Sequence, residues 1–273
     1  MDEYLFQSLK DIKKNKYQID SSQAESLIDE ILPFIGDQDP IIRDQTVYGI
    51  LAHLFHDKHL SKERLTHYLH LLISDQFLFF DIKNHLPYSV LKRSFTILQL
   101  VIIVYVHRRD NIISHDDIQV LYEAFIKYFQ EEKILIGYEQ SIGWMHSVAH
   151  SADLFAQLMQ IPWFDSEKIR VMLHLIAKKM MIDDYLYISN EDERMVVAIK
   201  KGLDQKKLSQ EQILSWLDLF LLEEVSEDYL TKSTLVNNIK HLLSALYFDC
   251  LGNESYTFIT EKISKILLHN KAK

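Results

Sequence analysis

Two histidines and an aspartate near the middle of the sequence have side chains and spacings suited to chemistry. His146, His150 and Asp153 lie in the segment GWMHSVAHSADLF, separated by four and three residues. On an α-helix with about 3.6 residues per turn, these side chains and Gln157 project from one narrow stripe. Imidazole nitrogens and a carboxylate on such a stripe could bind zinc, iron or manganese, or act in acid–base catalysis.

The same stripe has a structural interpretation, which we favour: a buried hydrogen-bond network. Both ring nitrogens of a neutral histidine can be satisfied by carbonyl or carboxylate oxygens. Small residues nearby would let a second helix approach closely, namely Ser147, Ala149, Ser151 and Ala152. A zinc protease of the HExxH type is disfavoured, because Ser147 follows the first histidine where that motif needs glutamate. A bound ligand and a metal site remain the alternatives.

Two further polar groups invite a metal interpretation, and for both we predict a simpler one. The segment MMIDDYLYISNEDER is acidic and is expected to be a solvated face, with divalent-cation binding as the alternative. Its carboxylates are Asp183, Asp184, Glu191, Asp192 and Glu193. A histidine-rich stretch has no carboxylate at a convergent spacing and is predicted to be structural or incidental; it contains His53, His56, His59, His67 and His70.

The composition predicts the fold that must position these residues. The chain has 273 residues, 48% hydrophobic, 25% charged and a net charge of −9, which is typical of a soluble globular protein. It contains only 6 glycines and 4 prolines, too few for the frequent turns of strand-rich folds. Since no linker or low-complexity tract interrupts it, we predict a single all-helical domain over residues 1–273.

Helix starts can be identified from capping residues that precede helix-period apolar patterns. Capping boxes or close relatives begin at Ser22, Ser114 and Ser209. Similar patterns follow Asp39, Ser61, Pro87, Ser141, Asp165, Asn190, Thr231 and Asn253. These spacings predict helices of ordinary length joined by short connections.

One of these starts narrows the fold class. In residues 37–55, Asp39 stands at a predicted N-cap, Pro40 at the first helical position, and Arg43 and Asp44 one turn later. This pattern resembles the second helix of a HEAT-type repeat, in which aspartate and arginine of adjacent repeats can pair. We therefore predict an irregular α–α superhelix of HEAT-like hairpins; the alternative is an ordinary capped helix in an irregular bundle.

The longest apolar run, residues 95–106, is too short to span a bilayer, which takes about 20 residues. It is predicted to be a central buried helix, with Lys92, Arg93, Arg108 and Arg109 marking its ends or binding neighbouring carbonyls. A membrane is therefore not expected as a partner.

The charge and the cysteine content restrict which partners and which cellular compartment are expected. No basic cluster is present, so nucleic acid is not expected. Cys250 is the only cysteine and is predicted to be buried, and the acidic N-terminus is unlike a signal peptide, so a cytoplasmic location is expected. No nucleotide-binding, kinase or hydrolase-elbow motif occurs.

Two functional hypotheses follow. The first is a binding or scaffold module with a protein or small-molecule ligand on a concave face. The second is an enzyme, such as a metal-assisted hydrolase, that uses the stripe.

Two motifs resemble those of an all-helical bacterial family, domain of unknown function 2785. The first is carried by Gly143, Trp144, His146, His150, Asp153 and Leu154, and the second by Glu191, Asp192, Glu193 and Arg194. The family commonly has arginine where this chain has Ile136. The resemblance implies a helical architecture and groups the two motifs, but it implies no activity. An Arg194–Asp153 ion pair would be structural, whereas Glu191 or Asp192 beside His150 would begin a metal or acid–base site.

Overall fold

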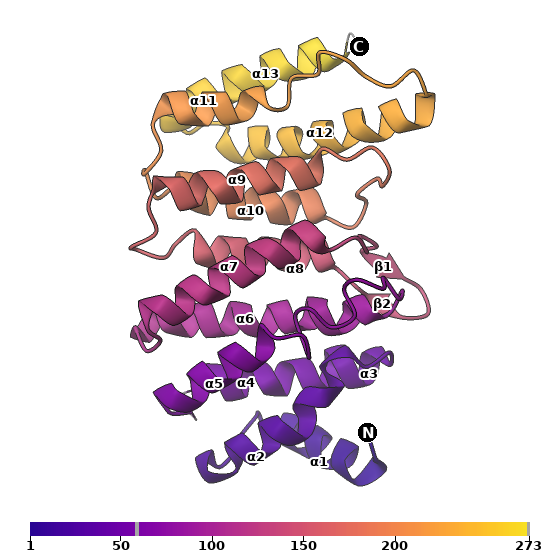
Figure 1. Ribbon diagram of the computed structural model, residues 1–273, viewed down its shortest axis with the longest axis vertical. Helices are drawn as coiled ribbons and strands as arrows, with labels where there is room; N and C mark the ends of the chain where they lie inside the picture. Colours follow the sequence, from indigo (N-terminus) through magenta and orange to yellow (C-terminus); the bar gives the residue numbers. More distant parts are fainter. Residues whose placement is uncertain (58–59, 272–273) are drawn as a thin grey trace. The chain divides into compact units, whose positions relative to one another are not determined.

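The computed structural model describes residues 1–57 and 60–271, and nearly all of their regular secondary structure is helical (Figure 1). The sheet within them is a two-stranded antiparallel hairpin. The all-α prediction is therefore confirmed. The chain divides into two compact units, residues 1–154 and 155–273, which are described separately.

The first unit contains helices of very different lengths and the hairpin. Its elements are α1 (Glu3–Lys14), α2 (Ser21–Ile31), the 3₁₀-helix η1 (Leu32–Gly36), α3 (Pro40–Ile42), the π-helix η2 (Arg43–Tyr48), α4 (Gly49–His56), α5 (Lys62–Leu72), α6 (Ser89–Asp110), α7 (His115–Glu131), β1 (Tyr138–Glu139) and β2 (Gly143–Trp144). Helix α8 (Ser147–Leu158) begins in the first unit and ends in the second.

The second unit is built from helices alone in the residues described. Its elements after α8 are α9 (Ser166–Met180), α10 (Glu191–Leu203), α11 (Gln210–Asp218), α12 (Tyr229–Cys250), the 3₁₀-helix η3 (Glu254–Tyr256) and α13 (Thr257–Lys271). Cys250 is buried as predicted, and this burial raises the pKa of its thiol to about 11.

Most predicted caps are present. Side-chain oxygens of Asp39, Ser61, Ser114, Asp165 and Ser209 accept hydrogen bonds from the first turns of their helices. Two starts were predicted a few residues late. Asp20, rather than Ser22, caps α2, and Asp228 caps α12, which places Thr231 inside the helix. In both cases an aspartate just upstream competes as the N-cap.

Helix α6 forms the core of the first unit, as the apolar run predicted. Within the described residues it alone is long and apolar enough to cross a membrane, but 78% of its most apolar window is buried inside the protein. Arg93 was predicted to mark the helix end or to bind a neighbouring carbonyl; it lies in the second turn, is completely buried and donates to the carbonyl of Phe80.

The segment with the HEAT-like pattern folds as a helix start, but its arginine has different partners. Asp39 Oδ1 accepts from Ile41 N at 2.8 Å, with Pro40 first in the helix. The buried Arg43 binds Asp44 of its own helix, and its Nη2 donates to the carbonyl of Ile142 at 2.8 Å. The arginine therefore holds the hairpin, and the predicted ladder to an aspartate of an adjacent repeat is not formed by Arg43.

Candidate functional site

The first histidine of the motif stands outside the helix. Helix α8 begins at Ser147, several residues after the start predicted behind Ser141, and His146 has a left-handed φ of 44°. Its carbonyl accepts from His150 N at 2.8 Å, and its ring stacks on Trp144 with centroids 4.3 Å apart. The prediction that His146 shares one helical stripe with His150 and Asp153 was therefore wrong, because the hairpin occupies the residues before Ser147.

His150 connects α8 to α6. Its Nδ1 lies 2.8 Å from the hydroxyl of Ser94, and that hydroxyl donates to the carbonyl of Met145. Because the only hydroxyl proton is used on Met145, His150 Nδ1–H donates to Ser94 Oγ. The His150 ring also meets Phe95 edge-on at 5.3 Å. These contacts are those of the structural interpretation of the motif.

The side chains of His146, His150 and Asp153 are not arranged as metal ligands. Within residues 1–57 and 60–271, no three His, Cys, Asp or Glu side chains are arranged to hold a metal ion. His146 and His150 have ring centroids 5.5 Å apart, and Asp153 is half-buried one turn further along α8. The three predicted ligands are thus near one another in sequence without converging on one point.

We expect Ser94→Ala to lower the free energy of unfolding by about 2 kcal/mol. The substitution removes one hydrogen-bond donor to Met145 and one acceptor for His150, and each net hydrogen bond contributes about 1 kcal/mol. Urea denaturation followed by circular dichroism measures the change. Ser26→Ala, which removes an exposed hydroxyl bound only to Gln23 O, is the control. Equal stabilities of the two variants would contradict the role of Ser94.

The second motif lies in the second unit, at the start of α10. Glu191 is completely buried, and its Oε2 accepts from Ser189 N at 2.8 Å. Burial raises the pKa of this carboxyl above its usual value. Asp192 and Arg194 are half-buried, and Glu193 is exposed. The acidic segment is mainly a solvated face, as predicted, with Glu191 as the exception.

The histidine-rich stretch has separate local partners. His53 stacks on Tyr17 with centroids 3.6 Å apart. His56 and His70 contact the carboxylates of Asp57 and Asp117, respectively. His59 lies outside the described residues. These contacts agree with the structural interpretation.

The hairpin after α7 is fixed against the start of α6. Gly143 has a φ of 82°, and an added Cβ would lie 3.4 Å from Pro40 Cβ and 3.5 Å from Arg43 Nη2. Ile142 and Met145 pack in one apolar cluster with residues 90 and 91 of α6. A glycine is suited to this position because it tolerates the left-handed backbone and the close approach of Arg43.

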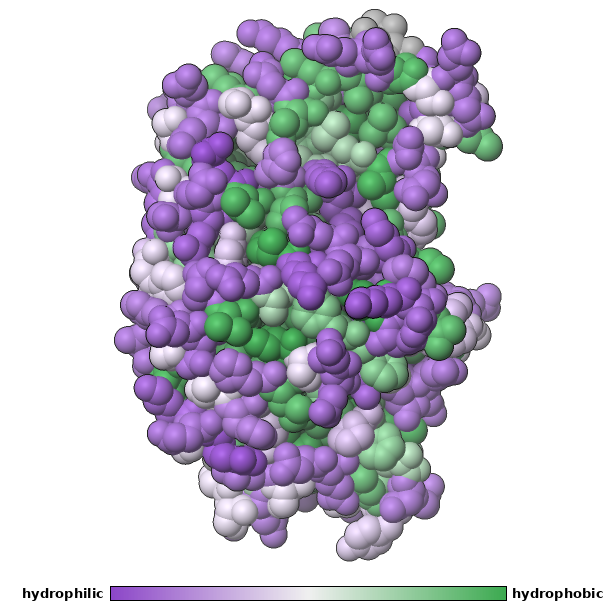
Figure 2. All heavy atoms as spheres, in the orientation of Figure 1, coloured by the Kyte–Doolittle hydropathy of each residue, from purple (hydrophilic) through white to green (hydrophobic). Residues whose placement is uncertain are grey.

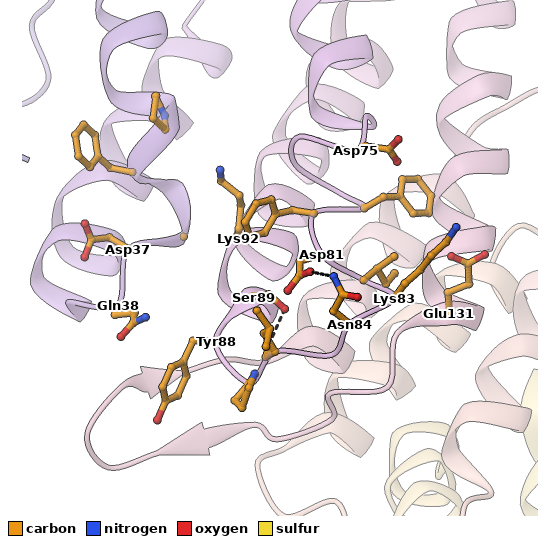
Figure 3. A pocket seen from close by; sticks show the side chains of 18 of the residues that line it. Asp37, Gln38, Asp75, Asp81, Lys83, Asn84, Tyr88, Ser89, Lys92 and Glu131 are labelled. Atoms are coloured by element: carbon orange, nitrogen blue, oxygen red, sulfur yellow. Dashed lines mark hydrogen bonds between the residues drawn. The ribbon is translucent and has the colours of Figure 1, made fainter.

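Beside this hairpin lies a cleft of about 1160 Å³, which we call the Lys92 cleft (Figure 3). It is lined by Pro33, Phe34, Gly36, Asp37, Gln38, Asp75, Phe79, Phe80, Asp81, Ile82, Lys83, Asn84, Leu86, Pro87, Tyr88, Ser89, Lys92, Lys127 and Glu131. The hairpin borders it, since Tyr88 Oη donates to Glu139 at 3.2 Å and Arg43 Nη1 to Asp37 O at 2.7 Å. The hairpin, which contains Gly143 and Trp144 of the motif, therefore holds Tyr88 at one edge of the cleft.

Lys92 is the most unusual group in the cleft. Its ammonium lies over the rings of Phe80 and Phe77, 4.6 and 5.2 Å from their centroids. No carboxylate or other polar partner binds it among the residues described. Burial lowers the pKa of this amine. The backbone comes close here: a Cβ added to Gly36 would lie 2.5 Å from Lys92 Cβ.

An ion pair beneath the cleft holds its walls. Arg93 donates to both oxygens of Glu132, at 2.7 and 2.9 Å, and to Phe80 O and Ser89 Oγ. Tyr128 Oη adds a hydrogen bond to the same carboxylate. The guanidinium and the carboxylate are both buried and are joined by two parallel hydrogen bonds, so this network is structural. The cleft was not predicted from the sequence. The only sequence feature that pointed to it was the adjacent pair Lys92 and Arg93.

A comparison with known families agrees with the resemblance of the motifs. The family described as "Protein of unknown function (DUF2785)" matches residues 78–248. No curated protein and no solved structure matches the chain. The match includes the cleft wall from residue 78, helix α6, the hairpin and both motifs, and it covers more than half of the chain. The chain therefore belongs to the DUF2785 family.

Proposed function

We propose that this protein is a binding module of HEAT-like helical hairpins and that its ligand is a small organic anion bound in the Lys92 cleft. The observation that supports this most directly is the unpartnered cation of Lys92 in a large cavity. Ligand pockets commonly measure about 300–1,000 Å³ and place a few polar groups in an apolar surround. The volume is therefore sufficient for a small molecule.

The charges of the cleft restrict the ligand. Three lysines line it, at positions 83, 92 and 127, together with four carboxylates, at 37, 75, 81 and 131. A polyanion would be repelled by these carboxylates, whereas a single anionic group can approach Lys92. Phe34, Phe79, Phe80 and Tyr88 supply aromatic surface. The combination favours a monoanion with an apolar or aromatic body.

Ligand-observed NMR with three probes tests this proposal. We expect benzoate to bind, phenyl phosphate, which is mostly a dianion at neutral pH, to bind more weakly, and benzylammonium not to bind. Lys92→Met should weaken anion binding at least about tenfold, because a charge-assisted hydrogen bond contributes about 1.5–3 kcal/mol. Lys14→Met, which removes an exposed lysine of α1, is the charge-matched control.

The pH dependence gives a second readout. Because burial lowers the pKa of Lys92, raising the pH neutralises this amine before it neutralises an exposed lysine. Anion binding should therefore weaken at a lower pH than the usual lysine pKa would predict. Unchanged binding to Lys92→Met, or preferential binding of benzylammonium, would refute the proposal.

A further inference from the structure

A second concavity lies between the last two long helices, in the second unit. This groove, the α12–α13 groove, measures about 570 Å³ and is lined by Tyr229, Lys232, Ser233, Val236, Asn237, Ile239, Lys240, Ser244, Leu267, Leu268, Asn270 and Lys271. Figure 2 shows apolar side chains exposed in the region of α12 and α13. Tyr229 and Leu268 are 77% and 71% exposed, and Leu230, next to Tyr229 in the sequence, is 72% exposed. Large apolar side chains exposed together are characteristic of interaction surfaces.

The charge of the groove is opposite to that of the chain. Every charged residue in its lining is a lysine, namely Lys232, Lys240 and Lys271, although the chain carries a net charge of −9. Lys232, Val236 and Lys240 follow one another at intervals of four along α12. This spacing puts an apolar residue between two cations on one face of the helix. The groove therefore complements an acidic, amphipathic surface.

The length of the groove matches a helix. The lining residues of α12 run from Tyr229 to Ser244, and the 15 steps between them at about 1.5 Å rise give about 22 Å. Lys232 and Lys240 are about 12 Å apart along the axis by the same rise. Carboxylates two turns apart on a docked helix have nearly this spacing. The small side chains of Ser233 and Ser244 allow close approach of another backbone.

We propose that the α12–α13 groove binds an amphipathic acidic α-helix of a partner protein. The apolar face of that helix packs on Val236, Leu267 and Leu268, and its flanking carboxylates pair with the three lysines. This is the helix-in-groove mode, in which apolar anchors recur every three or four residues. The exposed Tyr229 and Leu230 extend the apolar contact at the start of α12. The site is separate from the Lys92 cleft, and neither proposal depends on the other.

Fluorescence anisotropy with designed peptides tests this inference. The probe is an 18-residue amphipathic helix with leucine at every third or fourth position and glutamates flanking the leucine face. The comparison peptide carries lysines in place of the glutamates. We expect the acidic peptide to bind and the basic one to bind at least tenfold more weakly. Increasing salt should weaken binding, because the ion pairs are solvent-accessible.

Two double variants identify the surface. Lys232→Glu with Lys240→Glu should weaken the acidic peptide at least tenfold, whereas the matched pair Lys178→Glu with Lys201→Glu, both exposed and outside the groove, should bind as the unmodified protein does. Far-ultraviolet circular dichroism checks that both variants are folded. Absence of binding by the acidic peptide, equal binding of both peptides, or equal binding by both double variants would overturn the proposal. Binding of decanoate that is lost in Lys232→Glu with Lys240→Glu, together with no binding of the acidic peptide, would also overturn it and indicate a lipid-like ligand.

Discussion

Arg93→Met is expected to lower the free energy of unfolding by about 3–5 kcal/mol, the cost of removing one partner of a buried ion pair. The guanidinium and the carboxylate of Glu132 are 0% and 3% exposed. Without Arg93, the carboxylate retains Tyr128 Oη and the backbone N–H groups of Lys133 and Ile134 as donors but loses two charge-assisted hydrogen bonds. The carbonyl of Phe80 also loses its donor. Equilibrium urea unfolding of the purified variants gives the change.

A second ion pair provides the matched control. Arg170 and Glu167 lie at a similar distance, 2.6 Å apart, but their side chains are 53% and 65% exposed. Arg170→Met should therefore cost less than about 1 kcal/mol, since water screens the pair. The double variant Arg93→Met with Glu132→Gln should be more stable than the sum of the single effects predicts, because it leaves no unpaired charge. Similar costs for Arg93→Met and Arg170→Met would show that burial of the network is not what stabilises it.

Gly36→Ala is expected to destabilise the protein by about 3 kcal/mol, at the upper end of the usual cost of overpacking. The added Cβ would lie 2.5, 2.6 and 2.7 Å from Cβ, Cα and N of Lys92. Two of these atoms are backbone atoms of α6, so a side-chain rotation cannot relieve the overlap. Helix η1 or α6 must shift, and the Lys92 cleft changes shape with it. The midpoint of thermal unfolding and the binding of benzoate should both decrease.

The control is a glycine with more space. An alanine Cβ at position 49, in α4, would lie 3.3 Å from the hydroxyl of Tyr17, which is at the end of a flexible side chain. Gly49→Ala should therefore be nearly neutral or slightly stabilising, because alanine favours the helix by up to about 1 kcal/mol. If Gly36→Ala were as stable as Gly49→Ala, the close approach of η1 to Lys92 would not be a constraint on the fold.

The helical architecture could be predicted because it depends on local patterns. Ser114, Ser209 and Asp165 cap their helices as expected, since an N-cap involves residues within one turn. His146 shows where this reasoning failed. Its spacing from His150 suited a helix, but a two-stranded pairing and a left-handed backbone precede Ser147. Helical periodicity in the sequence cannot reveal this short hairpin, because the hairpin is stabilised by Arg43, about a hundred residues earlier.

The cleft could not be predicted for a related reason. Its walls come from residues 33–38, 75–92 and 127–131, which no motif connects. Lys92 and Arg93 are adjacent in sequence, yet one faces the cleft and the other is buried beneath it. Only the three-dimensional packing distinguishes an unpartnered lysine from one that marks a helix end. The family match covers residues 78–92 and 127–131 of these walls but not residues 33–38, and it assigns them no role.

The contact between Arg43 and the carbonyl of Ile142 has a consequence for synthesis of the chain. The two residues are 99 positions apart. At translation rates of about 5–20 residues per second, the hairpin emerges roughly 5–20 seconds after Arg43. During that interval the guanidinium has Asp44 but not its carbonyl partners in the hairpin. The nascent N-terminal helices should therefore remain accessible to proteases and chaperones until the ribosome has released residue 145, when the first unit can close.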